Sequence, residues 1–95
     1  MQINISELRK ITNQILDHLE ATGHDVIEIE ADFYWTIDKE ELYNPYEEPK
    51  KISLGQLYDD YEFLKNVSDN KTEPVSYALV WLSSIFRYIG EKIMF

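Results

Sequence analysis

Apolar residues recur at three- and four-residue spacing at the start of the chain, which predicts an amphipathic helix over residues 4–22. Asn4 is placed to cap this helix, and Glu7 stands three residues later, as in a capping box. Gly23 can adopt the left-handed conformation that ends a helix. The resulting apolar stripe consists of Ile5, Leu8, Ile11, Ile15, Leu16 and Leu19.

Strict alternation of apolar and polar residues follows, and it predicts an extended segment over residues 26–37 with one buried face. Such a strand exceeds the usual length of about five or six residues, so we expect a bend near Asp32. Its partner is not evident, because the remaining extended candidate is residues 50–52. We therefore expect an irregular neighbour or pairing between two copies. The apolar positions are Ile27, Ile29, Ala31, Phe33, Trp35 and Ile37.

Residues 38–52 have the least regular pattern. Asp38 and Glu41 can cap one helical turn, which Pro45 and Pro49 prevent from continuing. A loop of this length is often functional or disordered. Its apolar and aromatic residues predict that it packs against the body of the protein, and these are Leu42, Tyr43 and Tyr46.

Two further helices complete the expected fold. One covers residues 53–66, with Ser53 and Gln56 as a capping box, and the other covers residues 74–92, with Pro74 in its first turn. A polar turn at residues 68–72 separates them. The sequence therefore predicts a single domain over residues 1–95, of helix-rich α+β class, with three helices packed on one long or bent strand.

The last helix is apolar on two faces. Its second face carries Tyr77, Trp81 and Tyr88, and a helix that is apolar nearly all round is usually buried on both sides. Tyr and Trp are also enriched at protein interfaces, so an interface is the alternative. Together with the unpaired strand, this face leads us to predict a homodimer.

The net charge of −9 is concentrated in one segment. Residues 25–62 contain twelve acidic residues and three lysines, whereas the remainder of the chain is neutral. Such a segment repels nucleic acid and anionic membranes, and it attracts a basic protein partner. Ordinary solubility charge is the alternative. The predicted binding residues are Glu28, Glu30, Asp32, Tyr34, Glu47 and Glu48, and we expect neutralising the first three acids to leave the protein folded.

The sequence contains no recognisable catalytic motif. We therefore predict no catalytic residue, metal ligand or cofactor. There is no cysteine, no glycine-rich phosphate loop and no His-Glu-x-x-His motif. Asp59 and Asp60 could attract a cation, but neighbouring positions on a helix point about 100° apart. Asp60 and Arg87 are instead predicted to form a structural ion pair. The absence of a signal peptide or bilayer-length apolar run predicts a bacterial, cytoplasmic protein.

Three short segments resemble a family of small uncharacterised bacterial proteins. They are Phe33-Tyr34-Trp35-x-Ile37, the Gly-Gln-Leu-x-Asp-Asp run over residues 55–60, and the segment from Trp81 to the Arg-x-Ile-Gly run at residues 87–90. The resemblance covers roughly residues 25–91. It implies that these segments belong to one module, and it implies no activity.

Two classes of function are consistent with these observations. The first is a non-catalytic acidic module that acts by protein–protein interaction, one form of which is an immunity- or antitoxin-like inhibitor of a basic partner. The second is a metal-dependent or carboxylate-based small enzyme that uses the Asp59/Asp60 region.

Overall fold

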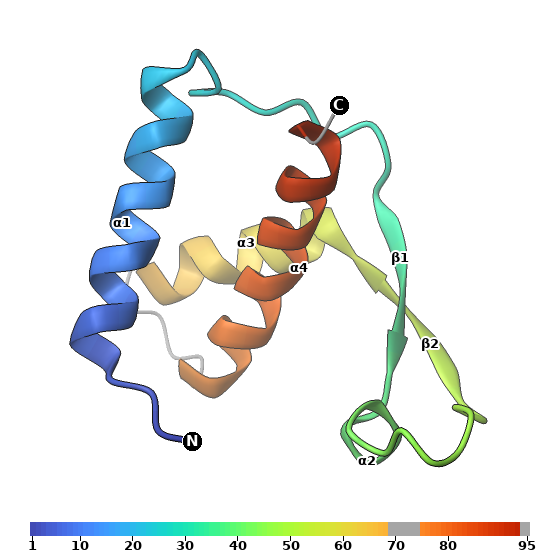
Figure 1. Ribbon diagram of the computed structural model, residues 1–95. Coiled ribbons are helices and arrows are strands. Elements are labelled where there is room, and N and C mark those ends of the chain that lie inside the picture. Colours follow the sequence, from blue (N-terminus) through green and yellow to red (C-terminus); the bar gives the residue numbers. More distant parts are fainter. Residues whose placement is uncertain (69–74, 94–95) are drawn as a thin grey trace.

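The computed structural model describes residues 1–68 and 75–93 and confirms a helix-rich α+β fold (Figure 1). The predicted polar turn, apart from Ser68, and Pro74 lie outside the described residues. Two strands form an antiparallel hairpin that projects from the helices, with α2 at its far end. The elements are α1 (Ile5–Ala21), β1 (Phe33–Ile37), α2 (Lys39–Leu42), β2 (Ile52–Gln56), α3 (Leu57–Ser68) and α4 (Val75–Ile93).

Helix α1 begins and ends where its local signals predict. The Asn4 side chain accepts a hydrogen bond from the Glu7 backbone N–H at 3.1 Å, and Gly23 follows the helix with a φ of 88°. The Thr22 backbone N–H also bonds to the carbonyl of His18 at 3.0 Å. Both ends of α1 are therefore set by residues within or next to the helix itself.

The strand prediction was too long at its start. Only residues 33–37 form β1, and they pair with β2 in a register that places Tyr34 opposite Gly55 and Trp35 opposite Leu54. Residues 26–32 form neither helix nor strand, because β2 supplies only five partner residues before α3 begins at Leu57. The strand that pairs with β1 is thus β2, most of which the sequence predicts as the start of a helix.

The predicted buried face of the strand was also wrong. Phe33 and Trp35 are 63% and 70% exposed, whereas Tyr34 between them is half-buried. Tyr34 lies on the face that meets α3 and α4, because its hydroxyl donates to Asp60 of α3. Period two shows which residues share a face, but the position of the helices decides which face they cover.

Helix α3 begins four residues later than predicted, and Asp32 takes the capping role that had been assigned to Ser53. The Asp32 carbonyl accepts from the Leu57 backbone N–H, and its Oδ1 accepts from the Tyr58 backbone N–H, both at 2.8 Å. Its Oδ2 accepts from the Gln56 side chain at 2.7 Å. The first turn of α3 is thus capped by a residue from a distant part of the chain.

We expect Asp32→Ala to lower the free energy of unfolding by about 1–2 kcal/mol, because α3 loses its cap and Gln56 loses its acceptor. The change is measured by urea unfolding at neutral pH. Asp38→Ala is the matched control, because Asp38 holds the N-cap position of α2 with no side-chain cap bond. Equal losses in the two variants would contradict the capping role, and Asp32→Asn should restore most of the stability.

The described core is small. Helices α3 and α4 pack together, with the rings of Phe63 and Trp81 4.9 Å apart between centroids. Among the described residues, Leu57 is the one apolar residue that is buried, at 4% exposure. Figure 1 shows α1 standing to one side of this helix pair, and no residue of α1 is buried. No helix within residues 1–68 and 75–93 has the length and apolar character needed to cross a bilayer.

Candidate interaction surfaces

Asp60 joins three elements at the base of the hairpin. It is 6% exposed, and its Oδ2 accepts hydrogen bonds from the Tyr34 hydroxyl of β1 and, at 2.6 Å, from the Ser84 hydroxyl of α4. The predicted Asp60–Arg87 ion pair is therefore wrong, since Arg87 lies in the solvent and pairs with Glu91 at 3.0 Å. A helical projection places Asp60 and Arg87 on the rims of their apolar faces, but it does not show how the two helices are rotated against each other.

The Tyr34 hydroxyl acts as a donor in this arrangement. Burial raises the pKa of Tyr34 above its ordinary value, and the hydrogen bond to Asp60 raises it further. The hydroxyl is thus protonated at neutral pH and can donate to the carboxylate. Asp59, the residue that precedes Asp60 in α3, is exposed. Within the described part of the chain, no group of three or more His, Asp or Glu side chains is arranged to hold a metal ion.

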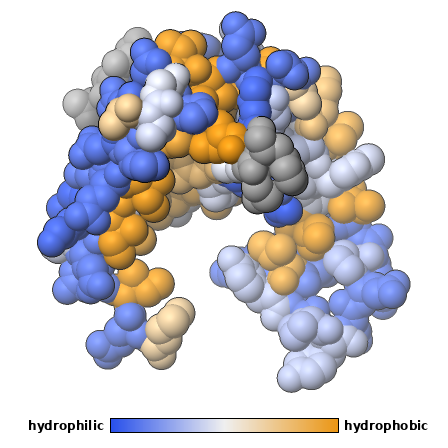
Figure 2. All heavy atoms as spheres, turned by 45° about the horizontal axis from the view of Figure 1, so that its top comes forward, coloured by the Kyte–Doolittle hydropathy of each residue, from blue (hydrophilic) through white to orange (hydrophobic). Residues whose placement is uncertain are grey.

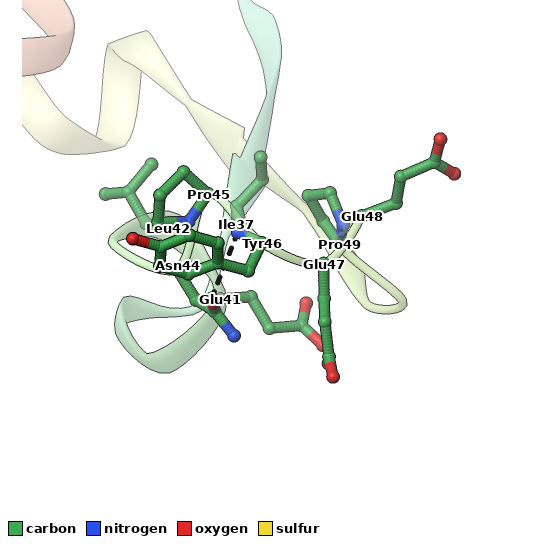
Figure 3. A pocket seen from close by; sticks show the side chains of 9 residues that line it. All are labelled: Ile37, Glu41, Leu42, Asn44, Pro45, Tyr46, Glu47, Glu48 and Pro49. Carbon is green, nitrogen blue, oxygen red and sulfur yellow. Dashed lines mark hydrogen bonds between the residues drawn. The ribbon is translucent and has the colours of Figure 1, made fainter.

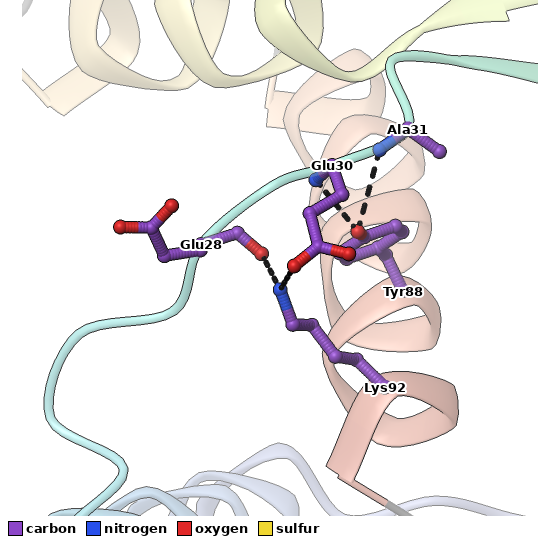
Figure 4. A network of polar contacts seen from close by, with 5 residues as sticks. All are labelled: Glu28, Glu30, Ala31, Tyr88 and Lys92. Atoms are coloured by element: carbon purple, nitrogen blue, oxygen red, sulfur yellow. Dashed lines mark hydrogen bonds and ion pairs between the residues drawn. The ribbon is translucent and has the colours of Figure 1, made fainter.

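The connection between α1 and β1 is attached to the C-terminal half of α4 (Figure 4). The Tyr88 hydroxyl accepts from the backbone N–H groups of Glu30 and Ala31, at 2.9 and 3.4 Å. Lys92 donates to the Glu28 carbonyl and lies 3.4 Å from the Glu30 carboxylate. Two predicted binding residues therefore have partners within the chain, although the Glu30 side chain stays 79% exposed.

The three aromatic residues of the predicted interface differ in their surroundings. Tyr88 binds the connection through its hydroxyl, and Trp81 packs on Phe63 of α3. Tyr77 lies 6.0 Å from Trp81 between ring centroids and is 57% exposed. The second face of α4 is therefore largely used within the molecule, by α3 and by residues 30–31, while Tyr77 remains open to solvent.

The far end of the hairpin carries an exposed acidic segment with aromatic side chains, which we name the acidic loop (residues 38–51). Its predicted packing against the body was wrong, because Leu42, Tyr43 and Tyr46 are 53%, 78% and 92% exposed. The Glu41 carboxylate accepts from the backbone N–H groups of Lys50 and Lys51, both at 3.2 Å, and so fixes the shape of the loop. The loop encloses an open cavity of about 380 Å³ (Figure 3).

The six predicted binding residues do not share one surface. Asp32 and Tyr34 form the structural bonds described above, Glu28 and Glu30 lie beside α4, and Glu47 and Glu48 are exposed in the acidic loop. Figure 1 places the acidic loop at the opposite end of the hairpin from the connection that carries Glu28 and Glu30. Glu47 and Glu48 lie instead next to Tyr46 in the lining of the loop cavity (Figure 3).

An uncovered apolar surface is the feature that sequence reasoning missed. The stripe of α1 remains exposed, with Ile5, Ile11 and Ile15 at 65%, 44% and 57%. Figure 2 shows hydrophobic side chains along the inner side of an open hollow. A cavity of about 630 Å³ lies between the connection, α3 and α4, and its apolar lining includes Tyr61 and Ile85. The apolar stripe of α1 was visible in the sequence, but the sequence did not show that no other described element packs over it.

Comparison with known proteins adds no assignment: no family model matches the chain, nor does a curated protein or a solved structure. The resemblance of the three motif segments to a bacterial family stays a prediction.

Proposed function

We propose that this protein is a non-catalytic module that binds a basic protein through the acidic loop. The observation that carries this proposal is the combination of exposed aromatic side chains and exposed carboxylates in one segment. Tyr43 and Tyr46 are 78% and 92% exposed, and Glu47 and Glu48 are exposed beside Tyr46. Tyrosine is enriched at the centres of protein interfaces, and charges around it increase the rate of association with a partner of opposite sign.

The fixed shape of the loop supports this proposal. Because Glu41 binds two backbone N–H groups across the loop, the tyrosines are presented from a preformed segment. Preformed loops lose less conformational entropy on binding. One form of the proposal is an immunity- or antitoxin-like inhibitor in the bacterial cytoplasm, for which small size and acidity are suitable. The alternative enzyme based on Asp59 and Asp60 is less favoured, because Asp60 is buried and already accepts hydrogen bonds from two part-buried hydroxyls.

The proposal is tested by comparing the double variant Glu47→Gln/Glu48→Gln with Asp17→Asn/Glu20→Gln, which removes the same charge from α1. A protein captured from native lysate at low salt is identified and purified, and its association rate is then measured with each variant. We expect the loop variant to associate several-fold more slowly at low salt, with the difference lost at high salt.

The variant Tyr46→Ala tests whether the loop contacts the partner directly, independently of the effect of net charge on association. We expect it to increase the dissociation rate about tenfold or more, because a central aromatic side chain is removed. Equal association rates for both charge variants, together with an unchanged dissociation rate for Tyr46→Ala, would exclude the acidic loop as the binding site.

A further inference from the structure

The chain exposes far more surface than a folded monomer of its size. Its accessible surface is 8426 Å², whereas a compact monomer of 11.3 kDa exposes about 5,700 Å². The excess of roughly 2,700 Å² is comparable with what each subunit buries in a large obligate homodimer. The radius of gyration of 15.2 Å likewise exceeds the value of about 12 Å for a compact chain of this length.

Exposed apolar side chains of α1 and of the hollow beside it contribute to this surface. No residue of α1 is buried, although its stripe has the three- and four-residue spacing of a helix that packs against others. Leu79 and Val80 of α4 are also 64% and 63% exposed. These two helices therefore present apolar side chains that the described part of the chain does not cover.

The connection that follows α1 is held by hydrogen bonds at both of its ends. At the near end, the His24 backbone N–H bonds to the carbonyl of Leu19 at 2.8 Å, so the turn after α1 is closed. At the far end, Tyr88 and Lys92 hold residues 28–31 against α4. These bonds define the two ends of the connection, and the stripe of α1 is open to a separate chain.

Charge favours a second copy of the same chain as the occupant. The acidic residues that give the chain its net charge lie in residues 25–62, outside both α1 and α4. These two helices together carry four acidic and four basic residues, so their surfaces are neutral in sum. A contact between α1 of one copy and α4 of the other would therefore bring together little like charge. On α3, Asp60 is buried and Glu62 pairs with Lys65 at 3.1 Å, which leaves Asp59 as its exposed acid with no partner among the described residues.

We infer that two copies form a homodimer in which the apolar stripe of each α1 enters the hollow of the other copy and packs against its α3 and α4. The surface differs from the aromatic face of α4 predicted from sequence, and it lies apart from the acidic loop. Reciprocal packing of this kind is self-complementary, as a two-fold dimer requires. A single contact of this kind covers both the α1 stripe of one copy and the 630 Å³ cavity of the other copy.

Sedimentation equilibrium at micromolar concentration tests this inference with two variants of α1. We expect wild-type protein to have about twice the mass of the 11.3 kDa chain, and Ile11→Glu to have the mass of one chain. Asn13→Glu is the matched control, because it adds the same charge to the opposite face of α1 and should remain dimeric. A wild-type mass of one chain would overturn the inference.

Engineered cysteines show which chain packs in the hollow, and this test does not depend on whether Ile11→Glu folds. The chain has no native cysteine, so any disulfide formed is an engineered one. Ile15→Cys is placed in one tagged chain and Tyr61→Cys in a differently tagged chain, and the mixed protein is oxidised. A disulfide between the two tags supports exchange of α1. In the Ile15→Cys/Tyr61→Cys double variant, a disulfide confined to one chain would show that α1 closes on its own helices and would overturn the inference.

The acidic loop variants distinguish this inference from the proposed function. Glu47→Gln/Glu48→Gln should leave the dimer mass unchanged. If the loop and α1 charge variants associate with the partner equally fast while the dimer is intact, the proposed function alone is contradicted. A wild-type monomer that still binds its partner through the loop would contradict the dimer alone.

Discussion

Replacing Asp60 by alanine is expected to lower the free energy of unfolding by about 3 kcal/mol, since hydrogen bonds to a charged group contribute about 1.5–3 kcal/mol each. The variant loses the acceptor of the Tyr34 and Ser84 hydroxyls at the junction of β1, α3 and α4. Ser84 keeps an alternative acceptor in the Trp81 carbonyl at 2.8 Å, so most of the loss should fall on Tyr34. For a domain of this size the melting temperature should fall by roughly 12–24 °C.

Urea unfolding of the wild type and four variants checks this expectation. Asp59→Ala is the matched control, because the neighbouring Asp59 of the same helix is exposed, and it should change stability by less than about 0.5 kcal/mol. Tyr34→Phe and the double variant with Asp60→Ala complete a cycle that isolates the energy of the pair. If Asp60→Ala and Asp59→Ala have equal stabilities, the junction does not hold the hairpin to the helices.

Gly55→Ala is expected to destabilise the protein by about 1–3 kcal/mol through overpacking. In the hairpin, Gly55 lies opposite Tyr34, and the Tyr34 ring crosses over it on the way to Asp60. A Cβ at residue 55 would overlap the ring of Tyr34. The ring would have to move, and its hydroxyl would leave the Asp60 carboxylate.

Gly90→Ala is the control for a glycine with open space around it. Apart from its chain neighbours and the backbone of its own helix, no atom of the described residues lies within 4 Å of a Cβ at Gly90. Because Gly90 is inside α4, alanine there should stabilise the helix by about 0.5–1 kcal/mol. In a Tyr34→Ala background, Gly55→Ala should become nearly neutral. A cost that persists in that background would show that the Tyr34 ring is not the reason for glycine at residue 55.

These two predictions depend on contacts that could be foreseen only in part. Tyr34, Gly55 and Asp60 all belong to the short motif segments noted in the sequence, but their spacing does not show that they meet. The sequence predicts Gly55 within a helix and Asp60 in an ion pair with Arg87, because each prediction agrees with a local pattern. The Tyr34 ring over Gly55 becomes visible only when β1 and β2 are paired.

Elements whose signals lie within a few residues could be predicted from the sequence. Helix α1, its cap at Asn4 and its end at Gly23 follow from neighbouring residues, and so does the single turn of α2 after Asp38. The extent of α4 also agrees closely with its apolar pattern. Helix spacing and capping act over one or two turns, so a short stretch of sequence contains the whole cause.

The tertiary structure alone decided the start of α3, the length of β1 and the side of β1 that is covered. Asp32 caps a helix 25 residues further along the chain, and Tyr34 reaches Asp60 across a gap of 26 residues. Such contacts depend on how whole elements are placed, which periodicity does not describe. The uncovered stripe of α1 follows for the same reason, because a pattern shows that a face is apolar but not what covers it.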